Sequence, residues 1–133
     1  KFIQKIMSQI KKDVKELNIV NDKLGTPTYT HDFAKNVKLL IEKNERGLFN
    51  MVCDGLTGRL EVAKELLKIL GLKNKIKINE VSSNYFAKEY FAERPECERL
   101  INKRLNSLGM NIMQDWKISL KEYIKNYYSN YIL

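Results

Sequence analysis

The strongest constraint on the fold of this chain is that helical and strand periodicity alternate along it. Apolar residues at three- and four-residue steps predict an amphipathic helix over residues 2–14. The β-branched stretch "LNIV" (Leu17–Val20) then predicts a short strand. Pro27 fixes its own φ angle, and Thr30 is placed to cap a second helix whose first turn holds Asp32, a favourable charge against the helix dipole. This order of helix, strand, proline-locked turn and helix is typical of an α/β protein.

The rest of the chain continues the alternation. The run "LFNMVC" (48–53) follows a helix stop at Gly47 and is short enough for a strand buried on both faces, as in parallel sheets. "KIKINEV" (75–81) alternates like a half-exposed strand, and Thr57 and Gly71 are placed to cap and to end the helix before it. Helical patterns cover residues 57–70, 85–91, 97–109 and 116–127. We therefore predict one domain in the order α-β-α-β-α-β-α-α-α.

The charge balance narrows the range of partners. With 24 Lys and Arg against 16 Asp and Glu, the formal charge is +8, which suits an anionic ligand. The basic residues are interleaved with acidic ones along the predicted helices, as in "KKDVKE", so solvated helix faces explain them and we expect no nucleic-acid partner. A small basic nucleic-acid-binding module remains a rival interpretation, which predicts steeply salt-dependent binding to DNA or RNA.

The sequence gives little support for a membrane protein, a disulfide-stabilised protein or a zinc protein. No apolar run approaches the length of a membrane span, and the opening "KFIQKIMSQIKK" lacks the continuous apolar core of a signal peptide. We therefore expect a cytoplasmic protein with no membrane partner. Cys53 and Cys97 have neither CxxC spacing nor a cluster of histidines beside them, so we expect two free thiols, with Cys53 buried, and no metal site.

Motifs for catalysis are missing. The single histidine, His31, has Asp32 beside it in sequence but no evident nucleophile, so a polar role beside a binding loop is favoured over catalysis. The sequence contains no GxGxxG, Walker or HExxH motif, and a search for Tyr-x-x-x-Lys comes no closer than Tyr90 and Arg94. We expect no catalytic residue and no cofactor-binding residue in this chain.

Four stretches taken together resemble one known family. They are "VNDKLGTPTYTHDFAKNVKLLI", "GLFNMVCDGLTGRLEVAKELLKILGL", "ERPECERLINKRL" and "DWKISLKEYI". In this order and spacing they resemble the C-terminal half of dTDP-4-dehydrorhamnose reductases and related sugar-nucleotide reductases, in the extended short-chain dehydrogenase/reductase family. The resemblance covers about residues 2–127. It implies a mixed α/β substrate-binding lobe plus the C-terminal edge of a Rossmann-type NAD(P)-binding fold, with residues 1–133 as a fragment of a longer enzyme.

The resemblance also implies that the chemistry lies outside this chain. Such reductases begin with a dinucleotide-binding half, which carries the glycine-rich loop and a catalytic Ser/Thr-Tyr-Lys set. We expect that half, with NADPH or NADH bound to it, upstream of Lys1. Hydride would pass to the C4 ketone of a dTDP-sugar in nucleotide-sugar biosynthesis, while this chain binds and orients the sugar and is inactive alone. A non-catalytic regulatory subunit on the same fold is the alternative.

The stretch "GTPTY" is the first substrate-binding candidate that the resemblance implies. It would form a shaped wall at the junction of the cofactor and substrate halves, held rigid by Pro27. Thr26, Thr28 and Tyr29 would offer polar groups to the ligand or to neighbouring backbone. The structural alternative is that Pro27 and Thr30 only start a helix.

Arg94 in "ERPE" is the second candidate. A guanidinium can hold a diphosphate in paired charge-assisted hydrogen bonds, and Pro95 would fix the backbone that presents it. An ion pair with Glu93 or Glu96 is the structural alternative. Family members often continue "RP" with an Asn-Ser pair where this chain has Glu96 and Cys97, which leaves the identity of the sugar open.

Two segments are expected to lack partners in the absence of the N-terminal half. The predicted strand at 48–53 would have an unpaired edge, and the helix at 2–14 would have an uncovered apolar stripe. We therefore expect the fragment to self-associate. Trp116 and the tyrosines of the last helix are expected to pack into the core and not to stack on a ligand.

Overall fold

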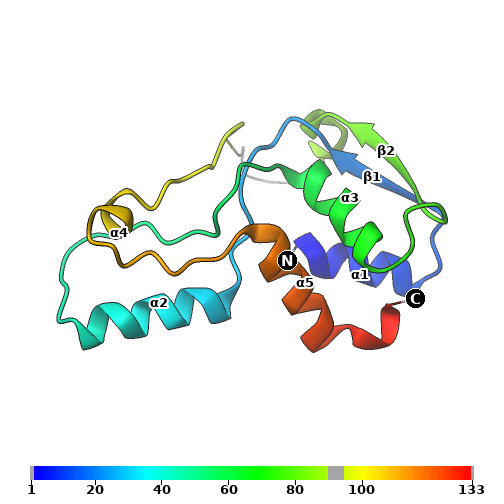
Figure 1. The fold of residues 1–133 in the computed structure, drawn as a ribbon. Coiled ribbons are helices and arrows are strands. Elements are labelled where there is room, and N and C mark those ends of the chain that lie inside the picture. Colours follow the sequence, from blue (N-terminus) through cyan, green and yellow to red (C-terminus); the bar gives the residue numbers. More distant parts are fainter. Residues whose placement is uncertain (1, 90–94, 133) are drawn as a thin grey trace.

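The computed structural model describes residues 2–89 and 95–132. Its regular elements, in chain order, are helix α1 (Phe2–Lys11), strand β1 (Glu16–Val20), helices α2 (Thr30–Glu42) and α3 (Arg59–Ile69), strand β2 (Lys77–Val81), 3-10 helix η1 (Ser83–Phe86), helices α4 (Lys103–Ser107) and α5 (Trp116–Tyr127), and 3-10 helix η2 (Ser129–Tyr131). The predicted mixed α/β class is confirmed. The strands, α1, α3 and α5 form one body, and α2 and α4 lie at the opposite end (Figure 1). Within these two ranges we find no helix with the length and hydropathy of a membrane span.

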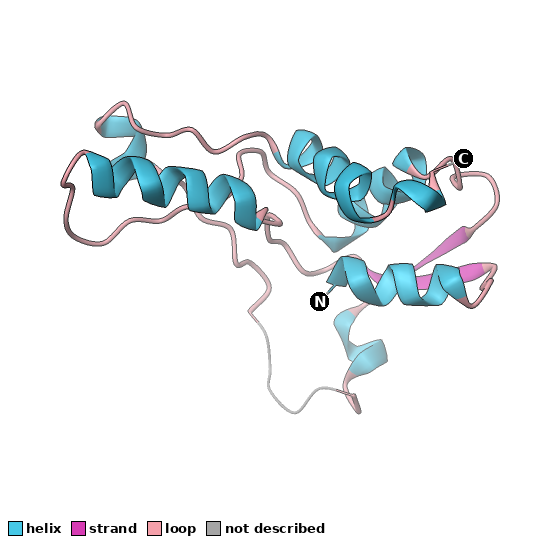
Figure 2. Cartoon of the chain, turned by 90° about the horizontal axis from the view of Figure 1, so that it is seen from below, coloured by secondary structure: helices cyan, strands magenta, loops and turns pink. Residues whose placement is uncertain are grey.

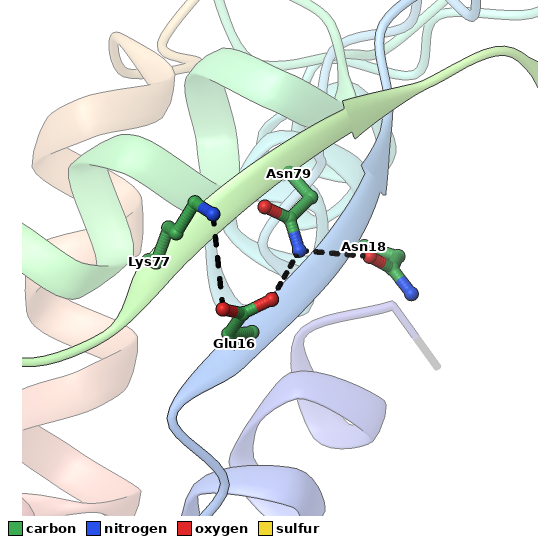
Figure 3. Close-up of polar contacts among 4 residues, drawn as sticks. All are labelled: Glu16, Asn18, Lys77 and Asn79. Carbon is green, nitrogen blue, oxygen red and sulfur yellow. Dashed lines mark hydrogen bonds and ion pairs between the residues drawn. The ribbon is translucent and has the colours of Figure 1, made fainter.

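The two strands form a small parallel sheet with one polar face. They pair in register over their whole length. Asn79 Nδ2 donates to Glu16 Oε2 at 2.7 Å and to Asn18 Oδ1 at 3.2 Å, and the Lys77 ammonium lies 3.7 Å from the Glu16 carboxylate (Figure 3). The hydrogen bond from Asn79 lowers the pKa of Glu16. Alternate positions of β1, such as Leu17, point into the core, because successive strand side chains face opposite sides.

The core lies between the strands and helices α1, α3 and α5. It is filled by Ile6 and Met7 from α1, Leu66 from α3 and Ile124 from α5, each exposed by 1% or less. The apolar stripe of α1 is therefore covered within the chain, and the expectation that it lacks a partner is wrong. The reason is that the C-terminal segment returns to α1, where the Lys11 ammonium lies 5.3 Å from the centre of the Tyr131 ring.

The end of the molecule that holds α2 and α4 has long irregular segments around these two helices (Figures 1 and 2). At this end of the molecule, the side chains of buried asparagines make hydrogen bonds to backbone groups, a role that neighbouring strands play in a sheet. Asn36 donates to the Met110 carbonyl and accepts from the Ile112 N–H, both at 3.1 Å. Asn102 accepts from the Val52 N–H at 2.9 Å and donates to the Val52 carbonyl at 2.8 Å. Since buried backbone groups need partners, these two side chains hold the irregular segments in place.

The predicted strand at 48–53 is wrong. This segment has no regular structure, with Leu48 87% exposed and Cys53 buried. Val52 pairs with a side chain and not with a neighbouring strand. A short apolar run does not by itself distinguish a strand from other buried segments, which is why the pattern predicted a strand here incorrectly. The edge that we expected this segment to expose does not exist.

The other predicted elements agree to different degrees. Strands β1 and β2 and helix α5 occur where the patterns placed them, and Gly71 follows α3 with a φ of 70°, as a helix stop requires. The helix predicted at 97–109 shortens to α4. Of the helix predicted at 85–91, the described part contains the end of η1, and residues 90 and 91 lie outside the described ranges.

Neither predicted threonine cap is correct. Helix α2 begins at Thr30 itself, with Tyr29 in the cap position, and α3 begins after Gly58. Thr57 is buried, and its carbonyl accepts from the Gly25 N–H at 3.2 Å, so tertiary contacts and not capping fix its position. Helix α2 also ends at Glu42, earlier than the stop expected at Gly47.

Candidate functional site

The candidate site lies at the carboxyl ends of the two parallel strands. The loop after β1 and the loop after β2 are joined there by Asp22, whose carboxylate accepts from the Ser83 N–H at 2.9 Å and the Ser83 hydroxyl at 3.0 Å. The backbone hydrogen bond from Ser83 lowers the pKa of the Asp22 carboxyl. In open α/β sheets, ligands bind outside this edge, so the loop over residues 22–29 is in the position of a binding loop.

Two further segments hold that loop. Leu24 donates to the Glu96 carbonyl and accepts from the Glu98 N–H, both at 2.8 Å. The Thr26 hydroxyl donates to the Gly55 carbonyl at 2.9 Å. The structure thus brings "GTPTY" beside the described part of "ERPE", although the two are some seventy residues apart in sequence. Arg94 itself lies outside the described residues.

The predicted site residues play different parts in this arrangement. Thr26 is engaged with backbone, as one of its two expected roles required. Tyr29 is 7% exposed; its ring stacks on His31 at a centroid distance of 4.8 Å, and its hydroxyl accepts from Asn126 at 3.3 Å. The Thr28 side chain is exposed and has no hydrogen bond within the described residues. Thr28 is therefore the member of "GTPTY" whose hydroxyl is available to a ligand.

A pocket of about 300 Å³ lies beside this loop, which is the lower end of the range for small-molecule sites. Three segments line it: the first turn of α1, the loop after β1, and one face of α5. Its lining residues are Phe2, Ile3, Gln4, Pro27, Thr28, Tyr29, Thr30, Trp116, Ser119, Leu120 and Tyr123. Three of the five predicted site residues thus share one pocket, and Trp116 is 4% exposed, in agreement with its expected core role.

Two other hollows lie away from the loop. One, of about 610 Å³, opens along α2 beside Phe33, Val37 and Ile41. The other, of about 710 Å³, lies between α3 and β2 and carries both lysines and glutamates, as solvated helix faces do. Neither is lined by a residue of the loop 22–29, so the pocket beside Pro27 remains the candidate.

The polar groups that line the pocket are aliphatic hydroxyls, phenols and one amide, from Thr28, Thr30, Ser119, Tyr29, Tyr123 and Gln4. Burial raises the pKa of Tyr123 to about 12 and also raises the pKa of Tyr127, so both hydroxyls stay protonated at neutral pH. Tyr127 Oη lies 3.2 Å from His31 Nε2. In residues 2–89 and 95–132 there is no group of three or more His, Cys, Asp or Glu side chains that could hold a metal ion. The hydroxyl and amide groups of the pocket can donate and accept hydrogen bonds.

A buried polar cluster behind the pocket was missed by sequence reasoning. Asp32 was expected only as a charge against the helix dipole, but it is 1% exposed and accepts from the Ser119 hydroxyl at 2.5 Å and from Gln114 Nε2 at 3.0 Å. The signal that could have found it is Ser119, a polar residue in the apolar stripe that Trp116, Leu120 and the rest of α5 turn toward the core.

Comparison with known proteins identifies the family of this chain. The sequence profile of the RmlD substrate binding domain matches residues 1–129. The chain is 26% identical over 119 residues to the spore coat polysaccharide biosynthesis protein SpsK of Bacillus subtilis. Its fold superposes on a dTDP-4-dehydrorhamnose reductase of Clostridium acetobutylicum with a TM-score of 0.83 at 33% identity over 92% of the chain. The reductase of Yersinia enterocolitica gives a TM-score of 0.84 at 26% identity over 96%, and that of Bacillus anthracis, in complex with NADP, gives 0.80 at 25% over 95%.

The chain spans only part of each relative. It covers 40% of the Bacillus subtilis protein. It covers 42% of the Clostridium and Bacillus anthracis reductases and 43% of the Yersinia reductase. A profile that matches almost the whole chain, together with a shared fold, gives the family: the chain belongs to the RmlD substrate binding domains.

Proposed function

We propose that this chain is the substrate-binding part of an NAD(P)H-dependent dTDP-4-dehydrorhamnose reductase-like enzyme, which reduces the C4 ketone of a dTDP-sugar in nucleotide-sugar biosynthesis. The observation that carries the proposal is the meeting of "GTPTY" with the segment after Arg94 at the carboxyl ends of two parallel strands. These are the stretches on which the resemblance to such reductases rests. The N-terminal NAD(P)-binding half would precede residue 1.

Within such an enzyme, the described residues would bind and orient. Pro27 and Tyr29 form a wall whose shape is fixed by a proline ring and by the stacking of the buried Tyr29 ring on exposed His31, so little conformational freedom is lost when a ligand binds there. The Thr28 hydroxyl would donate to or accept from the sugar. NADPH or NADH, held by the other half, supplies the hydride when bound. Orientation of the ketone by this wall contributes to the rate only when both halves are joined.

Arg94 is our candidate for the diphosphate contact, on the grounds of its chemistry and its place in "ERPE". The Arg94→Ala variant of the complete protein should raise KM for the dTDP-sugar about 10- to 150-fold, the size expected for a lost charge-assisted hydrogen bond. KM for the nicotinamide cofactor should change little. Equal changes in both constants, or in neither, would count against this assignment.

The decisive experiment is a turnover assay of the complete protein with NADPH or NADH and a dTDP-4-keto-sugar. Consumption of reduced cofactor with formation of the C4 alcohol supports the proposal. The isolated chain serves as the control and should be inactive, because we expect the residues of proton and hydride transfer upstream. Binding of the sugar nucleotide without turnover by the complete protein would instead favour the non-catalytic regulatory subunit.

A further inference from the structure

Asp32 is a buried carboxylate whose partners are neutral. It is 1% exposed, and no ion pair among the described residues involves it. Its oxygens accept from the Ser119 hydroxyl at 2.5 Å and the Gln114 amide at 3.0 Å. Burying a carboxylate is unfavourable unless strong hydrogen bonds compensate, so this cluster depends on both donors being held in place.

The direction of donation within the cluster is fixed. The Ser119 hydroxyl donates to Asp32 Oδ2, so its proton points at Asp32. The free lone pairs of the Ser119 oxygen then face the Cys53 thiol, whose sulfur is 3.5 Å away. Burial raises the pKa of Cys53, so the thiol keeps its proton and can donate it. The chain of donors runs from Cys53 through Ser119 to Asp32 and fixes the orientation of each side chain.

This cluster links α5, which lines the candidate pocket, to the start of α2, which follows the loop that also lines it. Ser119 lines the pocket from α5, one turn after Trp116. Asp32 lies three residues after Tyr29, in the first turn of α2, the helix that directly follows the loop over residues 22–29. Asp32 itself does not line the pocket. Its hydrogen bond to Ser119 nevertheless sets the distance between the part of the pocket lined by the loop (the loop wall) and the part lined by α5 (the α5 wall).

We infer that Asp32, acting through Ser119, is a positioning residue that sets the width of the pocket for a nucleotide sugar. The inference deepens the proposed function and, for its ligand, rests on it. Asp32 makes no contact with the ligand. Its effect reaches the ligand through Tyr29 and Trp116, whose relative placement it holds.

The first test is kinetic and uses the complete protein. Asp32→Asn keeps the side-chain volume but replaces one acceptor oxygen by an amide donor, and Ser119→Ala removes the donor. Each should raise KM for the dTDP-4-keto-sugar about tenfold, with kcat and KM for the cofactor within about twofold of the unchanged protein. The matched control is Asn36→Ala, which removes a buried hydrogen-bonding side chain one turn further along α2, away from the pocket. It should lower thermal stability and leave KM for the sugar unchanged.

The second test reads the pocket without a ligand. Trp116 is the single tryptophan of the 133-residue chain, so its fluorescence reports on the α5 wall. Asp32→Asn and Ser119→Ala should increase quenching of Trp116 by acrylamide, whereas Asn36→Ala should not. If the complete protein neither binds nor reduces the sugar, the proposed function fails while the fluorescence still tests the positioning. Unchanged quenching and unchanged KM in Ser119→Ala would overturn the inference, even if Asp32→Asn did not fold.

Discussion

Gly55 lies so close to the start of α5 that a side chain would not fit there. Replacing it tests whether this close approach stabilises the fold around the site. Its φ is +96°, a conformation that L residues rarely adopt. A Cβ atom built there would lie 2.8 Å from Trp116 Cδ1 and 2.9 Å from Asp115 Oδ2. Neither neighbour can move freely, because Trp116 is 4% exposed and Asp115 caps α5 by accepting from the Lys117 N–H at 2.9 Å.

The cost of Gly55→Ala follows from two contributions. Backbone strain at positive φ is worth ~1–2 kcal/mol. Crowding in a packed region adds ~1–3 kcal/mol, because Trp116 must shift or the loop must withdraw. We therefore expect the free energy of unfolding to fall by ~3 kcal/mol and Tm to fall by ~10 °C for a chain of this size. Affinity for the proposed nucleotide-sugar ligand should also fall, since the Gly55 carbonyl accepts from Thr26 in the loop over residues 22–29.

Gly109→Ala is the matched control. Gly109 also has a positive φ, of +64°, but a Cβ atom there would meet nothing within 4 Å. It should cost ~1 kcal/mol from strain alone. Urea denaturation of the two variants, with the slope of unfolding free energy against urea unchanged, measures the difference. If Gly55→Ala is no more destabilising than Gly109→Ala, the close approach of Gly55 to the start of α5 does not constrain the site as we argue.

Three further predictions concern stability and assembly. Asn102→Ala should lower the free energy of unfolding by ~2–3 kcal/mol, because both backbone groups of Val52 lose their hydrogen-bond partner. The control Asn50→Ala, which removes an exposed hydrogen bond of 3.4 Å, should change the free energy of unfolding little, and urea denaturation compares the two variants. The pKa of Asp22 in the folded chain lies below its ordinary 3.8, so its hydrogen bonds to Ser83 stabilise the fold above that pH. This stabilisation is lost as the pH falls through the folded-state pKa. The difference in Tm between the unchanged chain and Asp22→Asn should therefore shrink on acidification. The isolated chain should sediment as a dimer or larger species at micromolar concentration, because β1 pairs along one edge among the described strands; a mass of 15.7 kDa throughout that range would refute self-association.

The elements that the sequence predicted are those with a regular local repeat. Strand β2 alternates, β1 is rich in β-branched residues, and α5 repeats its apolar positions at helical spacing, so each pattern records which side meets the core. Gly71 could be assigned as a stop because a residue with φ of 70° is most often glycine. The stretch "GTPTY" became a candidate wall through the family resemblance, and Pro27 adds the local reason that its backbone is fixed.

What only the tertiary structure decided depends on residues far apart in the chain. Residues 48–53 have the composition of a buried strand, but no strand within residues 2–89 and 95–132 pairs with them, and the Asn102 side chain bonds to Val52 instead. Asn36 bonds to Ile112 across 76 residues, and Asp32 bonds to Ser119 across 87. A local pattern records the period of an element and not which distant side chain will satisfy a buried polar group. The sequence by itself therefore determined the α/β class and marked the loop over residues 22–29 as a candidate, whereas only the tertiary structure decided which distant side chains, such as Asp32 of α2 and Ser119 of α5, meet beside it.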